Sequence, residues 1–225
     1  MVAVVIILGY LLGSIPTAYL VGRAVRGIDL RHYGSGTISG TAVYYHVARP
    51  LVIAVGLFDI AKGALPTWLA LRLGLKLPIA VLAGLAAIVG HNWPVFLGFV
   101  GGRGLGTFLG VLLIIFPWGF PWLLIWLALG RLAKVTAVGA LLGLASMPFV
   151  MSLMDRPSAV ILAALAMLAL TVVKRLEANR LPLPEAPQER RRVLWRRLWL
   201  DRDVPQKEAW IYRVPGGGDK TSEVS

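Results

Sequence analysis

The sequence contains no cysteine, and only 15% of its 225 residues are charged. The lack of cysteine excludes disulfides and any metal or catalytic site that needs a thiolate, but it does not fix the compartment. Acidic residues are scarce as well, with 11 Asp and Glu against 23 Lys and Arg, which gives a formal net charge of +12. With 57% hydrophobic residues and a mean hydropathy of +0.74, a soluble domain could not bury so much apolar surface. Composition therefore predicts an integral membrane protein.

Long apolar runs make up most of the chain, and a bilayer span needs about 20 such residues. The runs lie at about 2–21, 48–72, 78–98, 106–117, 120–132, 136–153 and 157–173. The first has no basic leader or cleavage pattern, so we expect a retained span rather than a signal peptide. The fourth and fifth are short and are separated by the helix-ending "FPWGFPW", so both are tilted spans or one is re-entrant. The sequence predicts an all-α integral membrane protein with about seven transmembrane helices.

The basic residues fall mainly on alternate loops between these runs. If the N-terminus is outside, the outer loops hold only Arg72, Lys76 and Arg156. The inner side holds the tail and Arg23, Arg26, Arg31, Arg49, Arg103, Arg131 and Lys134. Positively charged loops stay on the cytoplasmic side. The pattern therefore predicts an outside N-terminus and a cytoplasmic C-terminus, with glycine-rich loops 34–41 and 101–107 on the cytoplasmic side.

The chain divides by composition into a transmembrane domain (1–173), a basic cytoplasmic or interfacial tail (174–213) and a disordered C-terminus (214–225). The tail segment "PQERRRVLWRRLWLDRD" mixes arginines with large apolar side chains. It suits a helix lying in the lipid headgroup layer, and it equally suits a helix packed on the inner loops. We expect no nucleic-acid partner, because this basic segment is tethered to a membrane domain.

The first glycine-rich loop reads "RHYGSGTISGTAVYYHVAR". Gly34 and Gly36 allow backbone N–H groups to turn towards a ligand, and the hydroxyls of Ser35, Thr37 and Thr41 add donors. Such a nest suits phosphate oxygens, particularly at a helix N-terminus, but no Walker-type lysine follows it. A flexible loop of small residues explains the same composition.

The second glycine-rich loop reads "GGRGLGT" and places Arg103 among four glycines before an apolar run. Backbone donors, the helix dipole and a guanidinium would converge there, which predicts an anion site. The alternative, a plain positive anchor, does not need the glycines. His91, ten residues before Gly101, could move a proton or donate to a phosphate, and it could equally be a packing residue.

Asp59 and Lys62 stand inside the second apolar run at a spacing of three residues. They share a helix face and can pair, which lowers the cost of burying either charge. Such a pair can be purely structural, or Lys62 can face an anionic cavity while Asp59 orients it. We expect no metal site, because three histidines without cysteine or ligand-like spacing do not form one.

Four motifs together carry a family resemblance: "GSIPTAYLVGR" at 13–23, "YGSGTISGTAV" at 33–43, "FDIAKG" at 58–63 and "GHNWPVFLGFVGGRGLGT" at 90–107. The chain resembles the bacterial integral-membrane acyl-phosphate:glycerol-3-phosphate acyltransferases over roughly residues 5–185. The fourth motif is the most specific of the four.

The resemblance implies a seven-helix bundle in the bacterial inner membrane, with its active site near the cytoplasmic face. It implies transfer of a fatty acyl group from acyl phosphate to the 1-hydroxyl of glycerol 3-phosphate, giving lysophosphatidic acid for phospholipid synthesis, without a cofactor. The expected partners are these two substrates and membrane lipid. The expected catalytic residues are Ser35, His91 and Arg103. Substrate or phosphate binding is expected of Gly34, Gly36, Thr37, Thr41, Arg49, Lys62, Gly101, Gly102, Gly104 and Thr107.

The chain departs from the usual motifs at polar positions. Thr37 and Ala42 stand where the family has asparagines, Tyr45 where it has an arginine, and Arg103 where it has a lysine. In the third motif, Glu177 stands at the asparagine position. These changes leave open a non-catalytic or retargeted relative that binds anionic lipid or the acyl donor. A small transporter fits the number of runs but lacks an inverted repeat.

Overall fold

The computed structural model describes residues 1–34 and 36–212; Ser35 and the predicted disordered segment 214–225 therefore lie outside the described residues. The α-helices of the described residues are α1 (Val2–Gly13), α2 (Thr17–Arg26), α3 (Gly40–His46), α4 (Leu51–Arg72), α5 (Leu77–Asn92), α6 (Leu105–Ile115), α7 (Gly119–Leu132), α8 (Thr136–Leu153), α9 (Ser158–Glu177), α10 (Pro187–Leu200) and α11 (Lys207–Ile211). Three 3₁₀ turns, η1 (Leu30–His32), η2 (Val95–Leu97) and η3 (Ala178–Arg180), complete the described secondary structure. The expected all-α class is confirmed.

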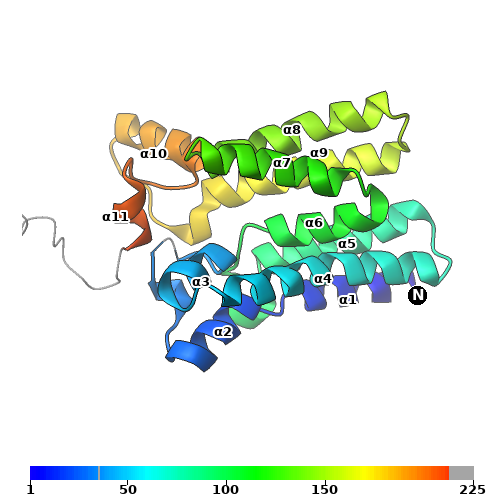
Figure 1. The fold of residues 1–225 in the computed structure, drawn as a ribbon, viewed down its shortest axis with the longest axis horizontal. Coiled ribbons are helices and arrows are strands. Elements are labelled where there is room, and N and C mark those ends of the chain that lie inside the picture. Colours follow the sequence, from blue (N-terminus) through cyan, green and yellow to red (C-terminus); the bar gives the residue numbers. More distant parts are fainter. Residues whose placement is uncertain (35, 213–225) are drawn as a thin grey trace, which may run out of the picture.

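The long helices run roughly parallel in two groups (Figure 1). One group holds α1, α4, α5 and α6, and the other holds α7, α8 and α9. The groups meet where α5 packs on α9 and α6 on α7. The N-terminus lies at one end of the bundle, and α2, α3, α10 and α11 gather at the other.

Five stretches of the described chain are long and apolar enough to cross a membrane: Val2–Arg26, Leu51–Arg72, Leu77–Leu97, Thr136–Leu153 and Ser158–Arg180. The short helices α6 and α7 match the fourth and fifth predicted runs. Pro121 is accommodated in the first turn of α7, where a missing N–H costs no hydrogen bond.

The first predicted span is not one continuous helix. α1 ends at Gly13, and after Ser14–Pro16 the chain restarts as α2. Pro16 has no N–H to continue the helix. The side chain of Ser14 donates to the carbonyl of Tyr10, 2.8 Å away, at this break. The interruption places polar groups of residues 14–17 inside the bundle.

Helices α4 and α6 cross closely because each carries a glycine at the contact. A Cβ on Gly63 would overlap the carbonyl of Thr107, and a Cβ on Gly110 would overlap the carbonyl of Ile60. Close approach of backbones through small residues is typical of membrane helix pairs. This crossing fixes the loop before α6, and hence Arg103, relative to α4.

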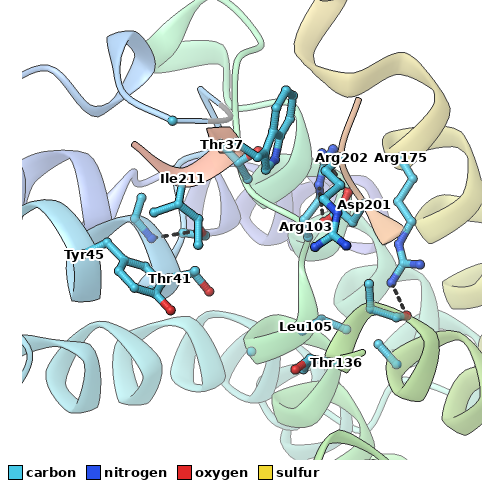
Figure 2. Close-up of a pocket in the computed structure, with 18 of the residues that line it drawn as sticks. Thr37, Thr41, Tyr45, Arg103, Leu105, Thr136, Arg175, Asp201, Arg202 and Ile211 are labelled. Atoms are coloured by element: carbon cyan, nitrogen blue, oxygen red, sulfur yellow. Dashed lines mark hydrogen bonds and ion pairs between the residues drawn. The ribbon is translucent and has the colours of Figure 1, made fainter. Parts of the chain in front are cut away.

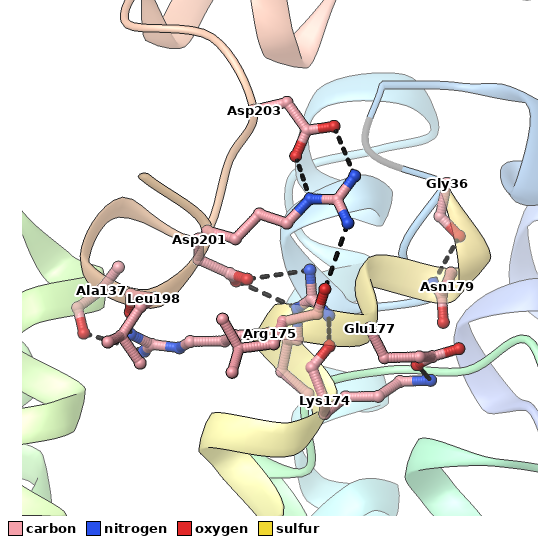
Figure 3. A network of polar contacts seen from close by, with 12 residues as sticks. Gly36, Ala137, Lys174, Arg175, Glu177, Asn179, Leu198, Asp201 and Asp203 are labelled. Carbon is pink, nitrogen blue, oxygen red and sulfur yellow. Dashed lines mark hydrogen bonds and ion pairs between the residues drawn. The ribbon is translucent and has the colours of Figure 1, made fainter. Parts of the chain in front are cut away.

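The basic tail, whose segment "PQERRRVLWRRLWL" forms α10 (Pro187–Leu200), is packed against the bundle. α10 packs on α8 and α9. Arg197 is buried and donates to the carbonyls of Leu176, Leu181 and Pro182 as well as to Asp203. Arg175 of α9 in turn donates to the carbonyl of Leu198, 2.8 Å away (Figure 3). Trp195 nevertheless remains 64% exposed on the outer face of α10.

Candidate active site

The two glycine-rich loops lie directly against each other. The amide of Ile38 donates to the carbonyl of Gly101 at 3.3 Å. The side chain of Asn179 joins the same loops, because its Nδ2 donates to the carbonyls of Gly36 and Gly101 at 3.1 Å each. Its Oδ1 accepts from the Gly101 amide at 3.4 Å. Asn179 thus holds together two glycine-rich loops that are far apart in the sequence.

Asn179 reaches both loops because the chain turns left-handed after α9. Ala178, Asn179 and Arg180 have φ values of 46°, 54° and 62°. Asparagine tolerates this region better than most residues, and the turn aims its amide across the end of the bundle (Figure 3). The spacing of the sequence alone gives no sign of this contact.

A cavity of about 460 Å³ opens beside the joined loops. Of the predicted site residues, its lining includes Gly34, Thr37, Thr41, His91, Arg103 and Gly104. One part of the wall is apolar, with Val52 of α4, Leu105 of α6 (labelled in Figure 2) and Ala140 of α8. The cavity therefore offers polar donors beside apolar surface, as a lipid-like anion requires.

Arg103 is held in a fixed position at the start of α6. Its Nη1 donates to the carbonyl of Lys174 at 2.7 Å. Its Nε donates to Asp201 at 3.1 Å, and its Nη2 lies 2.8 Å from the second oxygen of the same carboxylate. The side chain is only 12% exposed. A partly desolvated guanidinium of this kind binds carboxylate or phosphate strongly.

His91 belongs to a buried polar cluster with Asp59. Its Nδ1 lies 3.6 Å from Asp59 Oδ1. The same oxygen accepts from Lys62 Nζ at 2.9 Å and from Thr17 Oγ1 at 2.8 Å. The ring of His91 packs on Gly102, where a Cβ would overlap Nε2. The predicted ion pair of Asp59 and Lys62 is confirmed, and the histidine is placed between it and the second loop.

Several other predicted residues lie outside the cavity wall. Lys62 is buried and also donates to the carbonyl of Ile15, so it closes the break after α1 instead of lining the cavity. Thr107 is fully buried at the α4–α6 crossing. Arg49 is exposed, with its guanidinium over the ring of Tyr44 at 5.4 Å. Gly36 is placed next to the wall, with its carbonyl bound to Asn179.

The amides of the second loop are mostly engaged within the protein. The Gly101 amide donates to Asn179, and the Gly102 amide donates to the carbonyl of His91 at 3.0 Å. Of the predicted anion site, Arg103 and the first turn of α6 therefore remain as donors. Gly104, at the N-cap of α6, adopts a φ of 75°.

Comparison with known proteins identifies the chain's relatives. The family model for glycerol-3-phosphate acyltransferase matches residues 3–182. The chain belongs to the glycerol-3-phosphate acyltransferase family. It is similar to glycerol-3-phosphate acyltransferase 5 of Dehalococcoides mccartyi strain 195, with 37% identity over 97% of this chain and 96% of that protein. It is also similar to glycerol-3-phosphate acyltransferase 4 of strain CBDB1, with 37% identity over 91% of this chain and 90% of that protein.

Two solved structures share the fold. The glycerol 3-phosphate form of PlsY, an integral membrane glycerol 3-phosphate acyltransferase, superposes with a TM-score of 0.72 at 29% identity. The lysophosphatidic acid form gives 0.70 at 26% identity, and each match covers 78% of this chain and 88% of that chain. This acyltransferase is thus a multi-pass integral membrane protein with the PlsY fold, and acylation of glycerol 3-phosphate yields lysophosphatidic acid.

The acyltransferase cavity also contains residues that the sequence did not single out. Asp201, Trp210 and Ile211 come from the C-terminal tail, beyond the family match at residues 3–182. Arg175 of α9 also lines the cavity and holds α10 in place. Asn179 of η3, beside the cavity, holds the two loops together. In the sequence, Asp201 stands out only as an acidic residue in a basic tail.

Outside the membrane-spanning helices, His46 at the end of α3 also lines the cavity. Burial lowers the pKa of His46 below its ordinary value of 6.5, because it disfavours the charged imidazole. A hydrogen bond to the backbone of Ile211 raises the pKa by a smaller amount and links α3 to α11.

Proposed function

We propose that this acyltransferase takes its acyl group from acyl phosphate and transfers it to the 1-hydroxyl of glycerol 3-phosphate within the cavity around Arg103 and His91. The observation that carries the proposal is the joining of both glycine-rich loops at a cavity with an anchored arginine and a buried histidine. Membership of the family supports the acceptor, and the apolar part of the wall supports a lipid-like donor.

The reaction forms one bond and breaks one. The hydroxyl oxygen of glycerol 3-phosphate attacks the acyl carbonyl carbon, and the bond from that carbon to the phosphate oxygen breaks. Inorganic phosphate leaves, and the hydroxyl proton passes to His91 or to the departing phosphate. Because acyl phosphate is already activated, the protein contributes mainly positioning and charge neutralisation.

The residue roles follow from position. Arg103 binds one phosphate and stabilises the negative charge that develops on the transferred group. His91, oriented by Asp59 at 3.6 Å, accepts or relays the proton. Ser35 and the backbone of the first loop bind the second phosphate, with Thr37 and Thr41 on the same wall.

The same proposal includes the topology: seven crossings of the bacterial inner membrane, an outside N-terminus and a cytoplasmic active site. The described N-terminus and α11 lie at opposite ends of the bundle (Figure 1), which suits an odd number of crossings. Arg23, Arg26, Arg131 and Lys134 belong to helix ends or loops at the end that carries α2 and α10, as the positive-inside rule requires. In this arrangement α6 and α7 both cross as short, tilted helices.

A donor-choice assay tests the function. Purified protein in detergent receives glycerol 3-phosphate with either a long-chain acyl phosphate or the corresponding acyl-CoA, and lysophosphatidic acid is measured by mass spectrometry. We expect product and stoichiometric inorganic phosphate with acyl phosphate only. Saturable acyl-phosphate binding without product, beside an active relative, would instead establish a non-catalytic binding protein.

A further inference from the structure

The C-terminal tail places a carboxylate on the arginine that the proposed function assigns to phosphate. Both oxygens of Asp201 contact Arg103, one at 2.8 Å from Nη2 and one at 3.1 Å from Nε. The Nε contact is a hydrogen bond and the Nη2 contact is an ion pair, and arginine binds carboxylate and phosphate through these same N–H groups. Figure 2 shows Asp201 and Arg103 together on the cavity wall.

The rest of the tail covers the same cavity. We call residues 183–212 the C-terminal arm. Trp210, buried at 6% exposure, and Ile211 line the cavity from α11. The Ile211 backbone lies against Gly34, where a Cβ would be 2.7 Å from the Ile211 carbonyl, and bonds to His46. The arm therefore touches the first loop through α11 and the second loop through Asp201.

The arm is attached both to the bundle and to the cavity wall. Near α9, the buried Arg197 and Arg175 fix α10 through backbone carbonyls. Beyond α10, Asp201 adopts a left-handed φ of 53° and the chain leads to α11, so that Asp201, Arg202, Trp210 and Ile211 line the cavity. The cavity contacts of this part involve Arg103, His46 and the ring of Tyr45, which packs on Tyr212 at 6.2 Å. Asp203 in the same part accepts from Arg197 Nε at 2.7 Å and from Nη2 at 3.0 Å, so it stays tied to α10 when the cavity contacts open.

We propose that the C-terminal arm is an autoinhibitory cover in which Asp201 occupies the phosphate position at Arg103. A phosphate group and the Asp201 carboxylate cannot both take the Nε and Nη2 donors, so substrate binding requires Asp201 to leave. The arm lies beyond the family match at residues 3–182, and the alignment with glycerol-3-phosphate acyltransferase 5 of Dehalococcoides mccartyi, over 97% of this chain, extends into it. The inference rests on the proposed role of Arg103.

Competition is favoured over positioning by the remaining contact of Arg103. Its Nη1 is already directed by the Lys174 carbonyl at 2.7 Å, so the guanidinium keeps an anchor when Asp201 departs. Asp201 also removes positive charge from a cavity that must attract two anionic substrates. If Asp201 served only to position Arg103, its negative charge would still weaken the binding of both anionic substrates.

The test compares full-length Asp201→Ala and Asp201→Asn with wild type. Apparent affinity falls with the fraction of protein in the competent state, so removal of Asp201 should lower the KM of one phosphate-bearing substrate by about threefold or more. The inhibition constant for inorganic phosphate should fall in parallel, with kcat unchanged or higher. Glu189→Gln, which removes an exposed carboxylate from the start of α10, is the matched control and should behave as wild type.

The outcomes separate this inference from the proposed function. If Arg103→Ala abolishes activity while Asp201→Ala leaves both KM values unchanged or lowers kcat, the arm does not compete and the inference is wrong. If Arg103→Ala keeps wild-type kinetics, the proposed anion site itself is wrong. Thermal unfolding of each variant shows whether the bundle is intact.

A second measurement does not depend on removing Asp201. The chain has no cysteine, so Tyr45→Cys with Tyr212→Cys introduces a unique pair at the contact between α3 and the arm. A short cleavable thiol crosslinker across this pair should hold the arm closed and reduce turnover, and cleavage should restore it. Equal activity before and after cleavage would contradict the proposal.

Discussion

At the residue scale, the charged side chains of the site could be identified from the sequence, whereas the Asn179 amide that joins the two loops could not. Arg103, His91 and the pair of Asp59 and Lys62 were recognisable because charge is costly within apolar runs. Asn179 was not, because its role depends on a left-handed turn and on two loops more than 70 residues away. For Lys62, the sequence indicated a functional charge but not its partners, the Ile15 carbonyl and the Thr17 hydroxyl at the break after α1.

Asn179→Asp tests the joint between the loops. The substitution keeps the shape but replaces the Nδ2 donor by an acceptor facing the carbonyls of Gly36 and Gly101. We expect a loss of stability of about 2 kcal/mol, together with reduced acyl transfer, measured by thermal unfolding and product formation. Gln188→Glu on the exposed start of α10 is the control; an equal effect of both changes would show that Asn179 does not hold the loops.

The buried pair of Asp59 and Lys62 predicts non-additive stability effects. Lys62→Met leaves Asp59 buried without its ammonium partner at 2.9 Å, which should cost roughly 3–5 kcal/mol. The double variant Asp59→Asn with Lys62→Met should be less destabilised than Lys62→Met alone, because no isolated charge remains. Unfolding free energies in detergent give this cycle, and simple additivity would contradict a coupled pair.

At the element scale, the apolar runs predicted most helices to within a few residues, since hydropathy reports directly which segments can face lipid. Six of the seven runs correspond to α4, α5, α6, α7, α8 and α9. The first run corresponds to α1 and the start of α2, with the break at Pro16 within "GSIP", and Val2–Arg26 together is long and apolar enough to span a membrane. The short α3, capped by Ser39 accepting from the Ala42 amide at 3.4 Å, follows a glycine-rich loop whose composition favoured no fixed structure.

The α4–α6 crossing predicts opposite effects for two glycines. Gly110→Ala introduces a Cβ that overlaps the Ile60 carbonyl, so the helices must separate. We expect a lower unfolding temperature than wild type. Gly56→Ala on α4 meets no atom within 4 Å and should be neutral or stabilising by up to about 1 kcal/mol. Thermal unfolding of both variants checks this, and equal destabilisation would mean that the crossing is not close packed.

At the scale of the whole molecule, the site is assembled from the first loop, the second loop, the end of α9 and the C-terminal arm. The family motifs indicated the first two parts. The arm could not be predicted, because its helix amphipathicity suited a membrane surface as well as a protein surface. Packing of Arg197 and Arg175 on backbone carbonyls fixes α10 against the bundle, and Asp201 and Ile211 then reach the cavity.

The folded state should lose stability in acid through His46. Burial lowers the pKa of His46 below 6.5, and the hydrogen bond to the Ile211 backbone offsets this only in part, so the unfolded state binds a proton more readily. The contribution of His46 to stability is therefore full above pH 6.5 and declines as the pH falls towards the lowered pKa. The unfolding free energy, measured against pH, should fall in that window. His46→Gln should remove this pH dependence; unchanged behaviour in the variant would exclude His46 as its source.

The central claim is that Arg103 forms the anion site for acyl transfer from acyl phosphate to glycerol 3-phosphate. It is tested most directly by comparing kcat/KM for lysophosphatidic acid formation in Arg103→Ala and in Arg72→Ala. Arg72 is the control because it lies at the C-terminal end of α4, with its guanidinium over the ring of Trp68. We expect Arg103→Ala to lose about 10²-fold or more, and Arg72→Ala to stay close to wild type. Equal kcat/KM in the two folded variants would contradict the account.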